Sequence, residues 1–319
     1  MNTFDVITVG ELNVDLIFNE IEGFPEIGKE KLAGRLTNTL GSSSAIFASN
    51  LSSLGASVSF IGKIGEDSFG KKVLSSLNEN GVDTGLIITD SNLATGVTVA
   101  LNYGEERAMI THQGAMTNLG IEDIADEHLE KANHLHFSSF FLQPRIAKDL
   151  HVLMQRAKNT GLTTSFDPQW DPNEEWEMNL KEILPYVDVF LPNESELKYL
   201  TGKNDWKVAM KELSKLGNII VAKLGSKGSA FSKNGKLKTV EAFHNSNVAD
   251  AIGAGDSFNA GFISRFIAGD SIEECARFGN LTGAISTTSS GGTEAFSDKE
   301  HIIKIAKDVF GLKRNEIAL

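Results

Sequence analysis

The sequence lacks several features on which whole classes of protein depend. It has one cysteine, Cys275, among 319 residues, so no disulfide can form within the chain and a reducing cytoplasm is the expected location. No run of about 18 apolar residues occurs, so no membrane-spanning helix is expected. The N-terminus carries an acidic residue and opens directly into a strand pattern, which is unlike a signal peptide.

Basic residues are fewer than acidic residues. Lys and Arg number 30 against 42 Asp and Glu, which gives a net charge of −12. Phosphate backbones and anionic lipid surfaces attract basic faces, so neither nucleic acid nor a membrane is expected as a partner. A nucleotide site remains open, because it needs only local donors. The length and the hydrophobic share of 41% are sufficient for one large α/β domain.

Short apolar runs alternate with helical patterns along most of the chain. The runs that predict buried strands are 134–137, 163–166, 187–191 and 219–222. Helical patterns lie between them, for example at 146–159. This alternation is typical of a parallel sheet with helices on both faces.

Two segments, 11–40 and 95–115, do not fit the alternation. The second contains a hairpin pattern around Asn102-Tyr103-Gly104-Glu105. We expect both segments to form a small β lid over the carboxyl edge of the sheet, where ligands bind in open α/β folds. The prediction is therefore a single domain over 1–319, with the two lid segments inserted in it.

The run Asp250-Ala251-Ile252-Gly253-Ala254-Gly255-Asp256 carries the strongest chemical signal, and a helical pattern follows it. Small residues at 253–255 let backbone N–H groups converge at a helix start, an arrangement that binds anions. A carboxylate directly after such a nest would repel the anion unless it had another task. The natural task is to accept a proton from a hydroxyl that attacks a phosphate. On spacing alone, a tight turn followed by an exposed helix acid explains the run equally well.

Five further segments occur in a fixed order along the chain with this run. They are Val9–Asp15, Gly41–Gly55, Ile61–Gly70, Pro192–Glu196 and Ala222–Gly228. Together with the glycine-rich run, they resemble the ribokinase-like (PfkB) carbohydrate kinases over nearly the whole chain. The resemblance implies a ribokinase-like three-layer α/β/α sandwich with a mainly parallel central sheet and a small β-sheet lid. It also implies an ATP-dependent transfer of phosphate to a sugar hydroxyl.

The resemblance implies a role for each matching residue at the phosphoryl-transfer end. Asp256 would be the catalytic base, and the amides of Gly253, Ala254 and Gly255 would form an anion hole. Asn193 and Glu196 would organise Mg²⁺ and the phosphates of ATP, largely through water, because magnesium keeps part of its hydration shell.

The resemblance implies further ligand contacts on both sides of that centre. Lys223, Gly225 and Gly228 would line the ATP channel, with Asn280 beside the adenine and Gly291-Gly292-Thr293 close to it. A potassium ion would lie near Asp250, Ile252 and residues 286–291. On the sugar side, the expected contacts are Asp15, Gly41, Ser42 and Arg107.

The substrate side is where the chain departs from the family pattern. Ser42 replaces the second glycine of the first signature, and Ile46 stands where an asparagine contacts the sugar. Ser42 and its neighbours could supply hydroxyls instead or serve as helix caps. In Asp167-Pro168-Gln169-Trp170-Asp171, Gln169 can imitate the usual asparagine, but Asp171 reverses the charge of the usual arginine.

The reversed charge at Asp171 disfavours an acceptor that already bears a phosphate. Arg107 opposes this inference if it reaches an anionic group, although it can also be a solvated strand residue. The expected acceptor is a fructose-like ketose or a 2-keto-3-deoxy sugar acid, and pairing of two lids predicts a homodimer.

Three alternatives stay open. In an adenosine-type nucleoside kinase, Phe18, Phe24 or Tyr103 would stack on the base. An inactive sugar-binding homologue would have lost the chemistry. An unrelated dinucleotide enzyme would need a fingerprint that is missing after the first strand.

Overall fold

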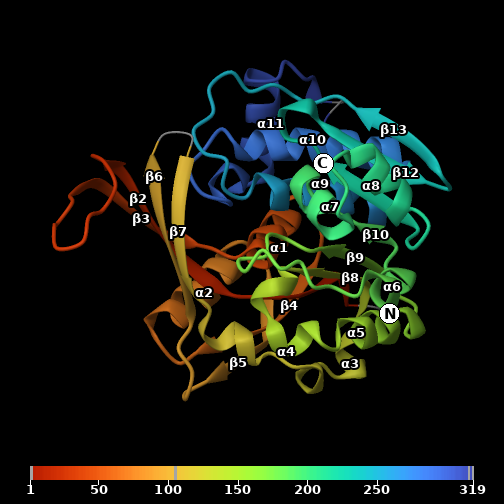
Figure 1. The fold of residues 1–319 in the computed structure, drawn as a ribbon, viewed down its shortest axis with the longest axis horizontal. Coiled ribbons are helices and arrows are strands. Elements are labelled where there is room, and N and C mark those ends of the chain that lie inside the picture. Colours follow the sequence, from red (N-terminus) through yellow and green to blue (C-terminus); the bar gives the residue numbers. More distant parts are fainter. Residues whose placement is uncertain (1–2, 104–105, 315–316, 318–319) are drawn as a thin grey trace.

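Two sheets organise the chain (Figure 1), and the computed structural model describes residues 3–103, 106–314 and 317. The main sheet has nine strands in the order β13-β12-β11-β10-β9-β8-β1-β4-β5, and the second sheet has the order β3-β2-β6-β7. The strands of the main sheet are β1 (Phe4–Val9), β4 (Val58–Gly65), β5 (Asp83–Asp90), β8 (Ala132–Ser138), β9 (Thr163–Asp167), β10 (Val189–Phe190), β11 (Ile219–Lys223), β12 (Ser229–Lys233) and β13 (Lys236–Val240). All of its pairings are parallel except those of β12 with β11 and β13.

Helices cover both faces of the main sheet. On one face, the packed helices are α1 (Ser43–Ser53), α2 (Ser68–Glu79), α9 (Ala254–Ile267), α10 (Ile272–Ser286) and α11 (Lys299–Asp308). On the other, they are α3 (Asp126–Leu129), α4 (Pro144–Ala147), α5 (Leu150–Asn159), α6 (Leu180–Ile183), α7 (Glu194–Thr201) and α8 (Trp206–Leu213). The expected three-layer arrangement is confirmed.

The strands are apolar on both faces because each face packs against helices. Val6 of β1 belongs to the core under α9 and α10, whereas its neighbour Ile7 belongs to the core under α5. Cys275 of α10 is fully buried, as expected for a core residue. Within the described ranges, no helix combines the length and the apolar character that crossing a bilayer requires.

The helical pattern at 146–159 was wrong as a single helix. The chain forms α4 and then α5, and Lys148 and Asp149 separate them. Asp149 leaves helical geometry, with φ −111° and ψ 12°, and stands directly before α5. Aspartate favours helix starts over helix interiors, because its side chain competes for backbone donors.

The two segments predicted as a lid form the second sheet, which projects from one side of the body (Figure 1) and is called the lid below. It contains β2 (Asn13–Ile21), β3 (Ala33–Leu40), β6 (Gly96–Tyr103) and β7 (Glu106–His112), which together cover most of 11–40 and 95–115. The hairpin of β6 and β7 is confirmed, although Gly104 and Glu105 of its turn lie outside the described residues. Because side chains alternate along each strand, this sheet has an inner and an outer face. The inner face, which carries Asp15, Ala100 and Met109, lines a cavity.

Candidate active site

The polar residues of the site follow the carboxyl ends of neighbouring parallel strands. Glu11 follows β1, Ser139 follows β8, and Asn193 follows β10. Asp167 and Lys223 are the last residues of β9 and β11. Since these strands are parallel, their carboxyl ends meet at one edge of the sheet, and the five residues are brought together there.

The glycine-rich run lies at the start of α9. Gly253 stands before the helix with φ 74°, a left-handed conformation that favours glycine. A Cβ atom there would lie 2.6 Å from Cα of Gly292, so the run passes too close to a second backbone for any side chain. No side chain of the described residues caps α9, although the amide of Ala254 donates to the carbonyl of Ala251 at 3.4 Å. A helix start without a side-chain cap can present backbone amides to an anion.

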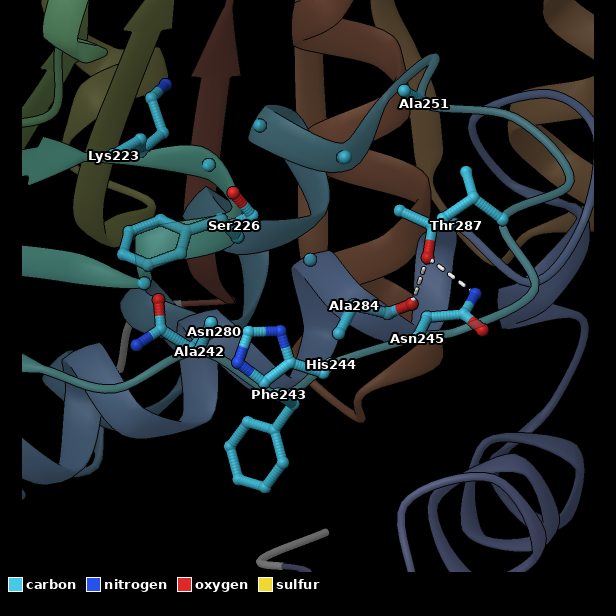
Figure 2. Close-up of a pocket in the computed structure, with 17 residues that line it drawn as sticks. Lys223, Ser226, Ala242, Phe243, His244, Asn245, Ala251, Asn280, Ala284 and Thr287 are labelled. Carbon is cyan, nitrogen blue, oxygen red and sulfur yellow. Dashed lines mark hydrogen bonds between the residues drawn. The ribbon is translucent and has the colours of Figure 1, made fainter. Parts of the chain in front are cut away.

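One cavity, of about 350 Å³, lies beside the start of α9 (Figure 2). Lys223, Gly225 and Gly228 line it, as expected for the predicted ATP channel. Asn280 also lines it and donates to the carbonyls of Val240 and Glu241. Most of the remaining surface is apolar, which suits a planar base.

Sequence reasoning did not find the loop that closes this cavity. Phe243, His244 and Asn245 all line it, and Asn245 donates to Oγ1 of Thr287 at 2.9 Å (Figure 2). The loop carries no periodic pattern, so the sequence offered no signal for it. Gly292 was expected near the adenine but packs against Ile46 and Gly253 instead.

A second cavity, of about 460 Å³, lies between the sheet edge and the inner face of the lid. The predicted residues that line it are Asp15, Ser42, Arg107, Asn193, Lys223, Gly225, Ile252, Gly253, Gly255, Glu196 and Asp256. The two cavities share Lys223, Gly225, Ala251 and Gly255 in their walls. The start of α9 therefore separates an apolar cavity from one that is rich in carboxylates and hydroxyls.

Asp256 is buried among charged groups at this boundary. Burial, and then the carboxylate of Asp167, raise the pKa of Asp256 to about 7. The Lys223 ammonium opposes that shift without a direct contact, because it pairs with Oδ2 of Asp167 at 2.5 Å. A carboxyl group with a pKa near neutrality is suited to exchange a proton at physiological pH.

Lys223 pairs with Asp167 and lies in the field of two further acids. Burial disfavours its charge, but the carboxylates of Asp167, Glu196 and Asp256 raise its pKa above the ordinary value. Asn259, on the turn of α9 after Asp256, donates to the same Oδ2 of Asp167 at 2.5 Å. The ammonium is therefore a fixed positive charge in the wall that both cavities share.

Asn193 and Glu196 form a reciprocal cap at the start of α7. Oδ1 of Asn193 accepts from the amide of Glu196 at 2.9 Å, and Oε2 of Glu196 accepts from the amide of Asn193 at 2.8 Å. Burial, and then the carboxylate of Asp167, raise the pKa of Glu196 to about 8. Across the part of the chain that the structure describes, no group of three or more His, Cys, Asp and Glu could hold a metal directly.

Asp15 lies on the inner face of the lid and is held by a neighbour that the sequence did not suggest. Asn13 donates to Oδ1 of Asp15 at 3.4 Å and to Oγ1 of Thr98 at 2.7 Å. Burial raises the pKa of Asp15 to about 7, although the guanidinium of Arg107 opposes the shift. Gly41 does not line the cavity, but a Cβ atom there would lie 2.1 Å from Oδ1 of Asp15, so its bareness makes room for that carboxylate.

The carboxylate of Asp250 accepts hydrogen bonds from two backbone amides. Oδ1 accepts from the amide of Ile252 at 2.9 Å, and Oδ2 accepts from the amide of Gly291 at 3.2 Å. Ser286, which belongs to the predicted potassium region, is buried, and its hydroxyl has no hydrogen-bond partner among the described residues. The residues expected to surround a potassium ion therefore include one oxygen that no described residue satisfies.

The structure also locates other side chains that sequence reasoning singled out. The rings of Phe24 and Tyr103 stack on each other, with 4.4 Å between their centroids, and neither lines the second cavity. Trp170 is an aromatic side chain that does line it. Asp171 is buried in its own loop, where it accepts from the amides of residues 173, 175 and 176. Ser42 caps α1 and also lines the cavity, so both of its expected roles are compatible.

Comparisons with known proteins point in one direction. Residues 3–299 match the family described as pfkB family carbohydrate kinase. The chain is 26% identical to fructokinase-1 of Zea mays, over 94% of this chain and 97% of the relative. It is also 26% identical to 2-dehydro-3-deoxygluconokinase of Bacillus subtilis, over 93% of this chain and 94% of the relative. The structure of Arabidopsis thaliana ribokinase complexed with ribose and ATP is similar, with 26% identity, a TM-score of 0.83, and coverage of 96% and 99%.

Proposed function

We propose, because the chain belongs to the pfkB family of carbohydrate kinases, that it transfers the γ-phosphoryl group of ATP to a hydroxyl of a monosaccharide, with Asp256 as the general base. One observation carries the proposal. An apolar cavity and a carboxylate-rich cavity share a wall at Lys223, Gly225, Ala251 and Gly255, and Asp256 stands on the carboxylate-rich side of it. The nucleotide would occupy the first cavity and the sugar the second.

The reaction follows from the charges at this wall. Asp256, ionised near neutral pH, accepts the proton of the sugar hydroxyl as that oxygen attacks the γ-phosphorus. The bond from phosphorus to the bridging oxygen of ADP breaks, and ADP leaves with the electron pair. The amides of Gly253, Ala254 and Gly255 then stabilise the charge on the transferred group. Lys223 contributes a fixed positive charge beside them.

Metal ions would complete the site. Asn193 and Glu196 would hold Mg²⁺ largely through water, which agrees with the lack of a direct three-ligand cluster among the described residues. Bound there, Mg²⁺ supplies positive charge that offsets the charge of the phosphates. Asp250, Ile252 and Ser286 would surround a potassium ion, to which the unpartnered Ser286 hydroxyl could contribute.

The acceptor that fits best is a neutral ketose. Asp15, Glu11 and Asp256 all line the acceptor cavity, and Arg107 is the guanidinium that faces Asp15. A second anion on the sugar would compete with Asp15 for that guanidinium. The similarity to a fructokinase supports the neutral ketose.

A 2-keto-3-deoxy sugar acid is the second candidate. Lys223 and Arg107 both line this cavity, and Lys223 is paired with Asp167. Arg107 has no such pair among the described residues, so it could bind the carboxylate of the sugar acid. The similarity to a 2-dehydro-3-deoxygluconokinase also supports this candidate. Arg107→Ala separates the two acceptors. It should abolish turnover of the sugar acid but leave turnover of a neutral ketose within about tenfold.

ATP consumption tests the proposal. ADP production is measured with ketoses, aldoses, 2-keto-3-deoxy sugar acids and nucleosides, and ADP formation with at least one sugar is expected. Asp256→Asn should then lower turnover by about 10³-fold or more while ATP still binds. Asp308→Asn, a matched change of an exposed acid on α11, should leave turnover unchanged. Near-normal turnover in Asp256→Asn would overturn the assignment of the base.

A further inference from the structure

Gln169 touches the candidate base, and the reaction described above makes no use of it. Its side-chain Nε2 donates to Oδ1 of Asp256 at 3.0 Å and to Oδ2 of Asp167 at 2.9 Å. Both acceptors are carboxylate oxygens, so the amide must present its NH₂ group to them. The two protons of that group match the two carboxylates, and the NH₂ group is therefore fully engaged between them.

The second partner, Asp167, is a rigid anchor. It is fully buried at the end of β9, and Lys223 and Asn259 both donate to its Oδ2 at 2.5 Å. Gln169 thus links the carboxylate of Asp256, at the start of a helix, to a fixed point on the central sheet. A side chain that is held at both ends can define the direction of the carboxylate between them.

The backbone of Gln169 gives an independent indication that its side chain is used. Its φ of 60° lies in the left-handed region, which asparagine, aspartate and glycine adopt far more readily than glutamine. Asparagine would therefore suit the backbone better, but its side chain is one methylene shorter, so its amide would lie farther from at least one of the two carboxylates. The length of glutamine serves the bridge and not the turn.

We propose that Gln169 is a positioning residue for the phosphoryl transfer, which fixes Oδ1 of Asp256 and leaves Oδ2 to accept the proton of the sugar hydroxyl. This inference rests on the proposed role of Asp256 as the base. Hydrogen bonds donated to an ionised carboxylate favour the ionised form. Without Gln169, the base should be misdirected and should also hold its proton to higher pH.

Other groups also act on the ionisation of Asp256, and they are the same in wild type and variant. The carboxylates of Asp167 and Glu11 disfavour it, whereas Lys223 and the hydroxyl of Ser43 favour it. Glu196 faces the same cluster from α7 and is itself affected by the charge of Asp256. A change in pH dependence on substitution of residue 169 alone therefore reports the loss of its amide.

Gln169→Asn is the most informative variant, because it keeps an amide and suits the left-handed backbone but shortens the side chain by one methylene. Glu174→Asn is the matched control: Glu174 has φ 57° in the same loop, is exposed, and makes no contact with Asp256. Thermal unfolding first establishes that each variant is folded at the assay temperature. Turnover, the KM values for ATP and sugar, and the pH profile of kcat/KM are then measured for each.

The expected result separates the two variants. Gln169→Asn should lower kcat at least tenfold, leave the KM for ATP within about twofold, and move the acid limb of the profile up by about half a pH unit or more. Glu174→Asn should match the wild type in all three. Normal kcat and an unmoved acid limb in a stably folded Gln169→Asn would overturn the proposal.

Gln169→Glu provides a second test that does not depend on the first variant. It keeps the length of the side chain but adds a carboxylate between Asp167 and Asp256, so the acid limb should move further toward high pH. An unmoved limb would again overturn the proposal. Failure of the proposed function looks different: Asp256→Asn would then retain turnover, whereas failure of this inference alone leaves Asp256→Asn inactive and the variants at residue 169 normal.

Discussion

At the scale of single residues, a raised pKa connects the burial of Asp256 to the pH range in which the protein works. The group accepts a proton only when ionised, and its pKa in the folded protein is about 7. Below that pH the protonated fraction grows, so kcat should fall about tenfold per pH unit and should level off above pH 7. Initial rates between pH 5 and 9 measure this limb.

A second carboxyl group titrates in the same range and must be separated from the first. Asp15 also has a pKa of about 7, and its ionised form would accept hydrogen bonds from sugar hydroxyls. Asp15→Asn should weaken binding of the sugar and raise its KM, while the acid limb of kcat stays near pH 7. Loss of that limb in Asp15→Asn would show that Asp15, and not Asp256, limits the rate in acid.

The residues that could be predicted from the sequence are those with an ordered local pattern. Asp256, Asn193 and Lys223 each lie in a short motif, and the structure brings all three to one edge of the sheet. Asn13 and Gln169 could not be found in this way. Their partners, Thr98 and Asp256, lie 85 and 87 residues away, and only the folded sheet determines such pairs.

At the scale of elements, the start of α7 combines a helix cap with the proposed Mg²⁺ site. Asn193 caps α7 as Asp205 caps α8, where its side chain accepts from the amide of Val208. Replacement of either cap by Ala should lower the free energy of unfolding by about 1 kcal/mol. Only Asn193→Ala should also raise the Mg²⁺ concentration needed for half-maximal activity, because Asp205 is remote from both cavities.

Denaturant unfolding and a Mg²⁺ titration of both variants measure the two effects. Equal Mg²⁺ requirements in the two variants would contradict a role for Asn193 in holding the ion. Equal losses of stability are the control that both caps were removed.

Elements were predictable where burial imposes a simple pattern. The strands of the main sheet are apolar on both faces because helices cover both, and the lid strands departed visibly from that pattern. The pattern at 146–159 failed because α4 and α5 continue the same apolar periodicity across their break. Hydrophobic spacing reports which face is buried, and it does not report where a backbone turns.

At the scale of the whole molecule, the outer face of the lid remains to be accounted for. In the strand register, four apolar side chains lie on the outer face of the lid, opposite to Met109. They are Phe18 of β2, Leu36 of β3, Leu101 of β6 and Ile110 of β7. Leu36 is 57% exposed and Ile110 is 74% exposed. Apolar rows on an open sheet are the surfaces that pair with another copy, so we propose that two lids associate in a homodimer.

Ile110→Lys tests this proposal. The charge should prevent association, so sedimentation analysis should give a dimer for the wild type and a monomer for the variant. Val208→Lys, on α8 and 51% exposed, is a matched control that should remain a dimer. A monomeric wild type at micromolar concentration, or a dimeric Ile110→Lys, would contradict the proposal.

The two cavities are also lined largely by different stretches of the sequence. Every residue that lines the cavity proposed for the nucleotide lies between 223 and 287, whereas the lid and loop residues of the cavity proposed for the sugar come from 11–170. A protein built in this way can change its sugar through its first half and keep its phosphoryl donor intact. Chimaeras that join the first half of one such kinase to the second half of another should therefore inherit the acceptor of the first parent.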